Sequence, residues 1–153
     1  MALALVVLAW PAPAQANIGD TLPELRARYG SAKDMGSQLL FQVQIVKDQV
    51  VRLPPSADPR TGYSVTVYFD GDHSAMEVFT PNTSDPAKSA ISQHDIDLIL
   101  ASEGDGLTWS PVQTNSGKPT WVRLDNKLVA RFSQDTSGKA DGASVLVIML
   151  NSK

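Results

Sequence analysis

The sequence predicts an α+β domain in which two tandem helix-plus-β-hairpin units form a mainly antiparallel sheet with short helices on one face. Residues 63–79 alternate between apolar and polar side chains around a turn, which is typical of a β-hairpin. Two short segments begin with helix-capping residues, and each precedes strand-like runs, so the same order occurs at 21–79 and again at 92–150. An antiparallel sheet with both helices on one face would bury the apolar stripe of each helix.

The composition is that of a globular protein. The chain has 153 residues, enough for one domain with a hydrophobic core, and its hydrophobic content is 42%. The net charge is −3 and the sequence has no basic patch, which disfavours nucleic-acid binding because phosphate contacts need clustered Lys and Arg. The absence of cysteine excludes disulfides, thiolate metal sites and a cysteine nucleophile.

The first sixteen residues, MALALVVLAWPAPAQA, carry no charge. A short apolar run, helix-breaking prolines and small residues before the end match a secretory signal. The run is too short for a membrane span, which needs about 20 apolar residues. We expect residues 1–16 to be a signal peptide cleaved after Ala16, and 17–153 to be a single periplasmic or secreted domain. The basic start of a signal is missing, so Met1 is either the true start or a position within a longer precursor.

The central hairpin has a testable register. A two-residue turn at 71–72 would place Asp70 opposite His73, with a glycine supplying the positive φ that such a turn needs. The same register predicts that Val67 lies opposite Met76. It puts five side chains on one apolar face: Val65, Val67, Phe69, Met76 and Val78.

Two short helices are expected from their capping residues. Thr21 with Glu24 forms a capping box, and Ser92 with Asp95 forms a similar pair at the second helix. A glycine follows each segment, which suits a helix end. Helices this short are unstable alone, so both must pack on the sheet.

Further strand-like runs complete the predicted sheet. Residues 39–53 predict two strands around a turn at 47–49, and residues 120–132 predict a hairpin that turns at 125–126. The nearly continuous apolar run at 143–150 predicts a strand buried on both faces or one in the middle of the sheet. Three segments are expected to be loops or linkers, namely 54–62, 80–90 and 133–142.

Asp70, Asp72 and His73 form the best candidate cluster for a metal site or for acid–base catalysis. Carboxylates and imidazole are suitable metal ligands, and together they can act as an acid–base pair. Turn geometry alone selects the same residues, and we favour that interpretation. His94 stands near the start of the second helix, where acidic residues such as Asp95 interact favourably with the helix dipole. The sequence has no nucleophile elbow, phosphate loop or dinucleotide fingerprint, so we expect no enzyme and no cofactor.

Trp109 and Trp121 are expected to fill the core, with their indole N–H groups reaching a partner at its rim. If they are exposed instead, they and Tyr68 are the candidate anchors for a binding partner.

Five motifs stand along the chain: IGDT at 18–21, a helix ending in RYG at 28–30, the hairpin at 67–79, a helix leading to tryptophan at 92–109, and the run at 121–132. Together they resemble a family of small exported bacterial proteins of unknown function. More remotely, the helix-then-sheet order is similar to the folds of the SmpA/OmlA outer-membrane assembly lipoproteins and of the β-lactamase inhibitor proteins (BLIP). This resemblance implies a periplasmic or secreted binding module. The chain lacks the lipid-attachment cysteine of those lipoproteins.

These observations favour a non-enzymatic exported domain that binds a protein or a cell-envelope component through a sheet face or loops. One alternative is a small hydrolase or metal-dependent enzyme using Asp70, Asp72 and His73 with help from His94. The other is a structural envelope protein. An exposed apolar patch on the sheet would support the first hypothesis, whereas both histidines would have to converge in one cleft for the second.

Overall fold

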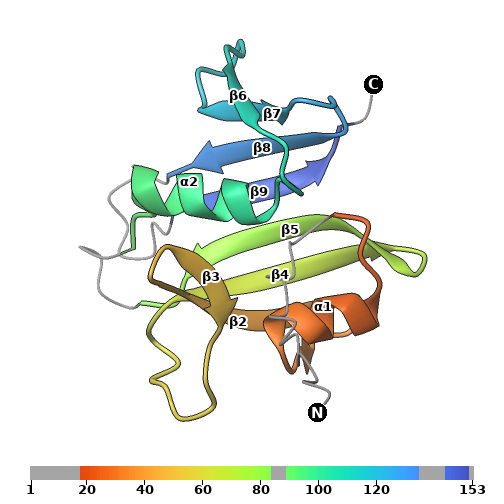
Figure 1. The fold of residues 1–153 in the computed structure, drawn as a ribbon, viewed down its shortest axis with the longest axis vertical. Helices are drawn as coiled ribbons and strands as arrows, with labels where there is room; N and C mark the ends of the chain where they lie inside the picture. The colour runs from red at the N-terminus through yellow and green to blue at the C-terminus, as the bar shows by residue number, and fades with distance from the viewer. Residues whose placement is uncertain (1–17, 84–88, 135–143, 152–153) are drawn as a thin grey trace, which may run out of the picture.

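The computed structural model describes residues 18–83, 89–134 and 144–151. A short helix begins each half of the described chain, and strands follow it (Figure 1). The first half contains α1 (Leu22–Tyr29), β1 (Lys33–Asp34), β2 (Gln38–Val46), β3 (Gln49–Arg52), β4 (Tyr63–Asp70) and β5 (His73–Pro81). The second half contains α2 (Gln93–Ser102), β6 (Trp109–Val112), β7 (Thr120–Arg123), β8 (Leu128–Ser133) and β9 (Val145–Leu150).

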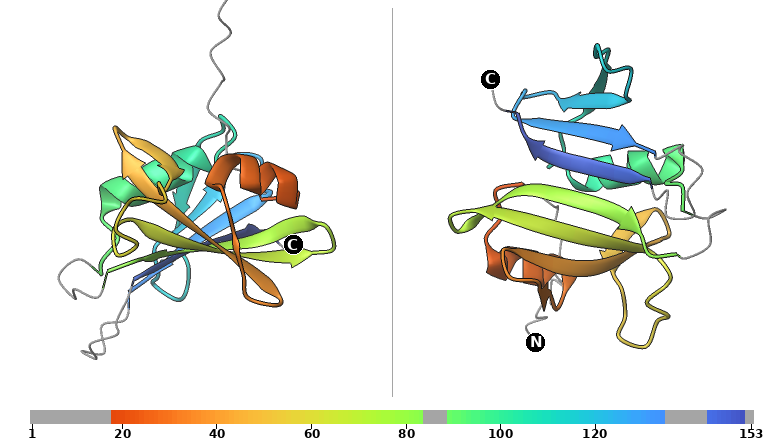
Figure 2. Two further views of the ribbon diagram at one scale, coloured as in Figure 1. Left: turned by 90° about the horizontal axis from the view of Figure 1, so that it is seen from below. Right: turned by 180° about the vertical axis from the view of Figure 1, so that it is seen from behind.

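The strands form one nine-stranded sheet in the order β1-β2-β4-β5-β9-β8-β7-β6, with β3 paired to β2 off this path. Every pair of neighbouring strands is antiparallel, and the β5–β9 pair joins the two halves. Both helices lie on one face of the sheet (Figure 2). The predicted α+β class and mainly antiparallel sheet are confirmed. Among the described residues, no helix has the length and apolarity needed to cross a membrane.

Helix α1 begins and ends where the sequence predicts. The Glu24 carboxylate accepts hydrogen bonds from the Thr21 backbone N–H (2.8 Å) and hydroxyl (2.7 Å). Gly30 follows the last helical residue with a φ of 85°. Leu25 and Tyr29, one turn apart, are buried and attach the helix to the sheet.

Helix α2 also confirms its predicted cap and buried face. The Ser92 hydroxyl accepts a hydrogen bond from the Asp95 backbone N–H at 3.1 Å. The buried stripe of the helix consists of Ile96, Ile99 and Leu100. Acidic Asp95 lies in the first turn, where the helix dipole favours a negative charge.

The other predicted turns and the last strand are also found. The β2–β3 turn places Lys47 and Asp48 at positive φ (49° and 60°), which is the geometry of a two-residue hairpin turn. Strand β9 lies between β5 and β8, so its apolar run is that of a central strand. Its Leu146 and Ile148 are fully buried toward the helices, whereas Val145, Val147 and Met149, which alternate with them, are partly exposed.

The turn of the β4–β5 hairpin is as predicted, but the register beyond it is not. Asp70 pairs with His73 across the turn. Farther along, Val67 pairs with Glu77, whereas the sequence predicted Met76. The register changes by one residue because β5 contains a β-bulge.

The bulge decides which side chains of β5 face the core. Ala75 is the extra residue, and it has no partner on β4. Because side chains alternate along a strand, one extra residue exchanges the two faces beyond it. Met76 and Val78, predicted to lie on the core face, therefore lie on the opposite face, and Glu77 is fully buried in the core. The predicted β4 valines are fully buried, as expected.

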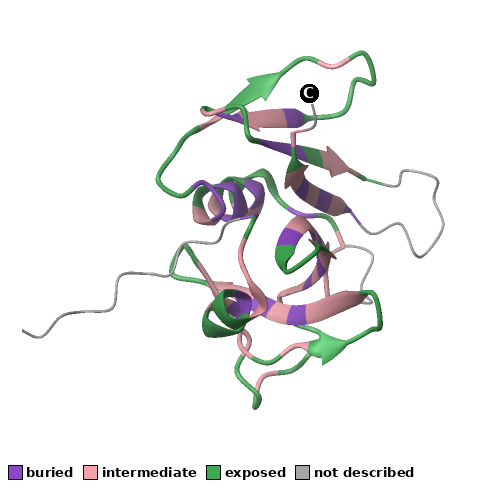
Figure 3. Ribbon diagram, turned by 90° about the vertical axis from the view of Figure 1, so that its right-hand side faces the viewer, coloured by how far each residue is buried: buried purple, intermediate pink, exposed green. Residues whose placement is uncertain are grey.

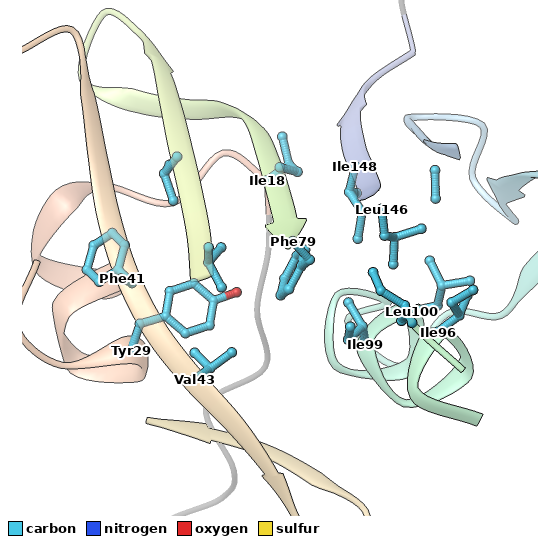
Figure 4. Close-up of a cluster of buried hydrophobic side chains, with 14 of the residues drawn as sticks. Ile18, Tyr29, Phe41, Val43, Phe79, Ile96, Ile99, Leu100, Leu146 and Ile148 are labelled. Atoms are coloured by element: carbon cyan, nitrogen blue, oxygen red, sulfur yellow. The ribbon is translucent and has the colours of Figure 1, made fainter. Parts of the chain in front are cut away.

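The hydrophobic core is one cluster between the helices and the sheet, with contributions from both halves. Along the helices and strands, buried residues alternate with partly exposed or exposed ones (Figure 3). In Figure 4, Phe79 stands between Tyr29 and Phe41 of the first half and Leu146 and Ile148 of the second. The seam between the halves is thus part of the core.

Candidate functional site

The predicted Asp70, Asp72 and His73 cluster lies at an exposed hairpin end, and its contacts are those of a structural turn. All three residues are exposed. His73 Nδ1 lies 2.7 Å from the Gly19 carbonyl oxygen, and because a carbonyl only accepts, Nδ1 carries the proton and donates it. The described ranges contain no group of three or more His, Asp or Glu side chains placed to hold a metal ion.

The two histidines do not share a cleft. The exposed His94 imidazole lies 3.3 Å from Asp48, at the β2–β3 turn. Next to it in α2, the Asp95 carboxylate accepts a hydrogen bond from the Tyr63 hydroxyl at 2.6 Å. Tyr63 begins β4, whereas His73 follows its far end, and an eight-residue strand spans about 23 Å at about 3.3 Å per residue. The structure therefore separates the residues that the enzymatic alternative needs together.

Trp109 and Trp121 are half-buried at the edge of the core. The Trp109 indole N–H donates a hydrogen bond to the Leu100 carbonyl at 2.7 Å, as expected for a rim tryptophan. Both indoles line a shallow hollow of about 320 Å³ beside Pro111. Tyr68 lies elsewhere, on the opposite face of the sheet, so the three candidate anchors do not form one site.

Figure 2, right, shows the sheet face that neither helix covers. The cross-strand partners at the centre of this face are apolar. We call this apolar centre the open-face patch. Its first row consists of successive cross-strand partners from β4 to β7: Tyr68, Met76, Met149, Val129 and Val122. Apart from Val129, which is buried, these side chains are partly exposed.

A second row lies beside the first. Val78 pairs with Val147 across the β5–β9 seam, and both are partly exposed. Thr66 and Arg131 continue this row on β4 and β8. Arg131 is exposed and is the charged member of these two rows. The patch thus comprises the first row with Val78 and Val147.

A second candidate site is a buried acidic cluster at the seam, which the sequence did not predict. The Tyr29 hydroxyl, at the end of α1, lies 2.9 Å from Glu77 Oε2 on β5 and 2.7 Å from Glu103 Oε1, directly after α2. Both glutamates have 0% exposure. The Arg28 guanidinium lies beside them and forms an ion pair with Asp20. Three elements therefore bring two carboxyl groups to one phenol.

The electrostatics follow from burial. Burial raises the pKa of Glu77 to about 7, against the smaller opposing effects of the Tyr29 hydrogen bond and the Arg28 charge. Burial, and next the charge of Glu77, raises the pKa of Glu103 well above its ordinary value. The same causes, burial and the neighbouring carboxylates, raise the pKa of Tyr29. The raised pKa values favour the protonated form of both carboxyl groups. Because both carboxyls are closed to solvent, the cluster offers no access to a substrate.

Two features of the sequence mark the two glutamates as unusual, although neither relates them to each other. Glu103 follows the last turn of α2, where the helix dipole disfavours a negative charge, so an acid there requires a special environment. Glu77 interrupts the apolar run AMEVF. The chain has three glutamates, and two of them meet in the core.

Comparisons with known proteins give no relative. No family model matches the chain, and no curated protein or solved structure matches it significantly.

Proposed function

We propose that this chain is an exported, non-enzymatic domain that binds a protein partner through the open-face patch. The observation that supports this proposal is a continuous apolar surface across five adjacent strands with neither helix packed on it. Contiguous apolar side chains that remain exposed on a folded domain are typical of interaction sites. Polar side chains adjoin the patch on the same face, as at the rim of an interface: Gln42, Ser64, Thr80 and Ser133.

The composition of the patch indicates the chemistry of the partner. Met76 and Met149 pair across the seam, and flexible methionines adapt to varied apolar surfaces. Arg131 is the cation beside them, and a guanidinium at an interface is best matched by a carboxylate. The expected partner is a protein surface that is apolar, with an acidic side chain opposite Arg131.

Export and the internal repeat complete the proposal. The signal-like residues 1–16 lie outside the described residues, so export rests on their sequence and on the resemblance to small exported bacterial proteins. We interpret α1 to β5 and α2 to β9 as two tandem units, because each starts with a capped helix and continues as antiparallel strands. In this interpretation the patch is formed where the two units join.

The test is capture of a partner from a cell-envelope extract with residues 17–153 as bait. Val78→Glu and Met149→Glu place a like charge against an acidic partner and are expected to abolish capture. Leu124→Glu is the matched control, because Leu124 is 64% exposed on the β7–β8 turn, outside the patch. All baits must show the same cooperative melting.

The outcomes separate the hypotheses. A partner retained by the Leu124→Glu bait and lost with both patch variants supports the proposal. A partner retained equally by all of these baits refutes it, as does no partner at all, which would favour a structural envelope protein. A further bait, with Asp70, His73 and His94 changed to Ala, tests whether these polar residues bind the partner. Loss of the partner with this bait alone would assign the binding site to them instead of to the patch.

A further inference from the structure

If both glutamates were ionised, the acidic cluster would have one proton, that of the Tyr29 hydroxyl, for two short oxygen–oxygen contacts. The Tyr29 hydroxyl has one proton and donates it to one carboxylate at a time. Its other short contact, whether 2.9 Å to Glu77 or 2.7 Å to Glu103, is attractive only when that carboxyl is protonated and donates to the phenol oxygen. The hydrogen-bond geometry therefore requires at least one carboxyl proton in the folded state.

The surroundings also disfavour a doubly ionised pair. The outer oxygens, Glu77 Oε1 and Glu103 Oε2, are buried and have no hydrogen-bond partner in the described part of the chain. An anionic oxygen that is closed to bulk solvent and accepts no hydrogen bond is strongly destabilised. A neutral carboxyl is less costly there, because it places less charge on the oxygen.

The nearby charges do not remove this requirement. The groups that face the pair are Arg28 and Tyr29 from α1 and Asp20 from the segment before it. Arg28 is bound to Asp20, so these two charges offset each other. With both glutamates ionised, the cluster of Glu77, Glu103, Arg28 and Asp20 would carry a net charge of −2. With one proton on the carboxyl pair the net charge is −1, and with two it is zero.

We propose that Tyr29, Glu77 and Glu103 form a proton-dependent latch that holds α1 and α2 on the sheet, closed while the carboxyl pair is protonated and weakened when it ionises. The latch spans the seam, since its members come from α1, β5 and the end of α2. It is independent of the open-face patch, so either proposal can fail without the other.

The direction of the pH dependence follows from linkage. An unfolded glutamate loses its proton near pH 4.5, whereas Glu77 in the folded chain has a pKa of about 7. The folded state thus holds protons that the unfolded state has released. The stabilisation is complete below pH 4.5 and is lost as the pH rises toward 7. For each proton that only the folded state holds, the folding equilibrium constant falls about tenfold per unit of rising pH in this window.

The first measurement is carboxyl NMR of the full chain with ¹³C-labelled glutamate. Three signals are expected, because the chain has three glutamates. Glu24 is the internal control, because the Thr21 hydrogen bonds lower its pKa. We expect Glu77 or Glu103, or both, to remain protonated at pH 6. If both are ionised at pH 5 in the folded chain, the proposal is overturned.

The second measurement compares urea unfolding of the wild type and of Glu103→Gln between pH 4.5 and 8. Glutamine keeps a donor and an acceptor but cannot ionise. As the pH rises, the folding equilibrium constant of the variant should therefore fall by about tenfold per pH unit less than that of the wild type. An identical pH slope would refute the latch. If Glu103→Gln does not fold, Glu77→Gln gives the same comparison, and the NMR titration of the wild type decides the protonation state without any variant.

Discussion

Removing the Tyr29 hydroxyl tests the geometry of the cluster directly. Tyr29→Phe keeps the ring, which packs against Phe41 with 5.5 Å between centroids. It leaves Glu77 and Glu103, both fully buried, without the hydroxyl that contacts each of them. A buried polar group without its partner costs about 1–3 kcal/mol, so two of them cost about 2–6 kcal/mol.

The matched control is Tyr63→Phe, which removes a hydroxyl that donates to the Asp95 carboxylate. Asp95 is only partly buried, so water can replace the lost donor and the expected cost is about 1 kcal/mol. The assay is urea unfolding at pH 6, with the slope against urea checked for constancy. A Tyr29→Phe variant that loses no more stability than Tyr63→Phe would show that the hydroxyl does not hold the two carboxyls.

Two further substitutions test the backbone and capping arguments. Gly62→Ala would place a Cβ 2.1 Å from the Val43 carbonyl oxygen at a φ of +80°. We therefore expect the free energy of unfolding, measured by heat or urea, to fall by at least about 2 kcal/mol. An unchanged stability would contradict the close approach of the loop to the strand. Ser92→Ala removes the acceptor of the Asp95 N–H and should lower the free energy of unfolding by about 1 kcal/mol, whereas Ser92→Gly should lower it by only about a few tenths of a kcal/mol. Equal stability of Ser92→Ala and the wild type would argue against the cap.

The elements that local sequence determines were predictable. Thr21 with Glu24 and Ser92 with Asp95 identified both helix starts, because capping depends on residues three positions apart. The hairpin turns were predictable for the same reason, because the backbone geometry of a turn restricts the residue types at its two to four positions. The uninterrupted apolar run of β9 predicted either a strand buried on both faces or one in the middle of the sheet, and the structure shows the second.

The register of β5 and the acidic cluster depend on contacts between distant segments. The Ala75 bulge has no sequence signature of its own, yet it reverses the faces of Met76 and Glu77. Glu103 lies 74 positions from Tyr29, so no local pattern relates the two. The same bulge accounts for both candidate sites, because it turns Met76 toward the open face and Glu77 toward the core.

The cluster also offers a physical reason for one register of the two halves. Apolar pairs across the seam, such as Phe79 with Leu146, are non-directional, and a slip of two residues would keep every side chain on its face. Tyr29 and Glu77 belong to the first half and Glu103 to the second, so the contact between Tyr29 and Glu103 depends on how the two halves are joined, with Glu77 opposite Ile148. Replacing all three members of the latch at once should differ from Tyr29→Phe, because neither carboxyl is then left buried without the hydroxyl. We expect the Tyr29→Phe, Glu77→Met, Glu103→Met variant to be at least as stable as the wild type at pH 7 and to lose the pH dependence. If the polar cluster specifies the register, this variant will show doubled amide signals for β5 and β9; a single set of signals would assign the register to apolar packing alone.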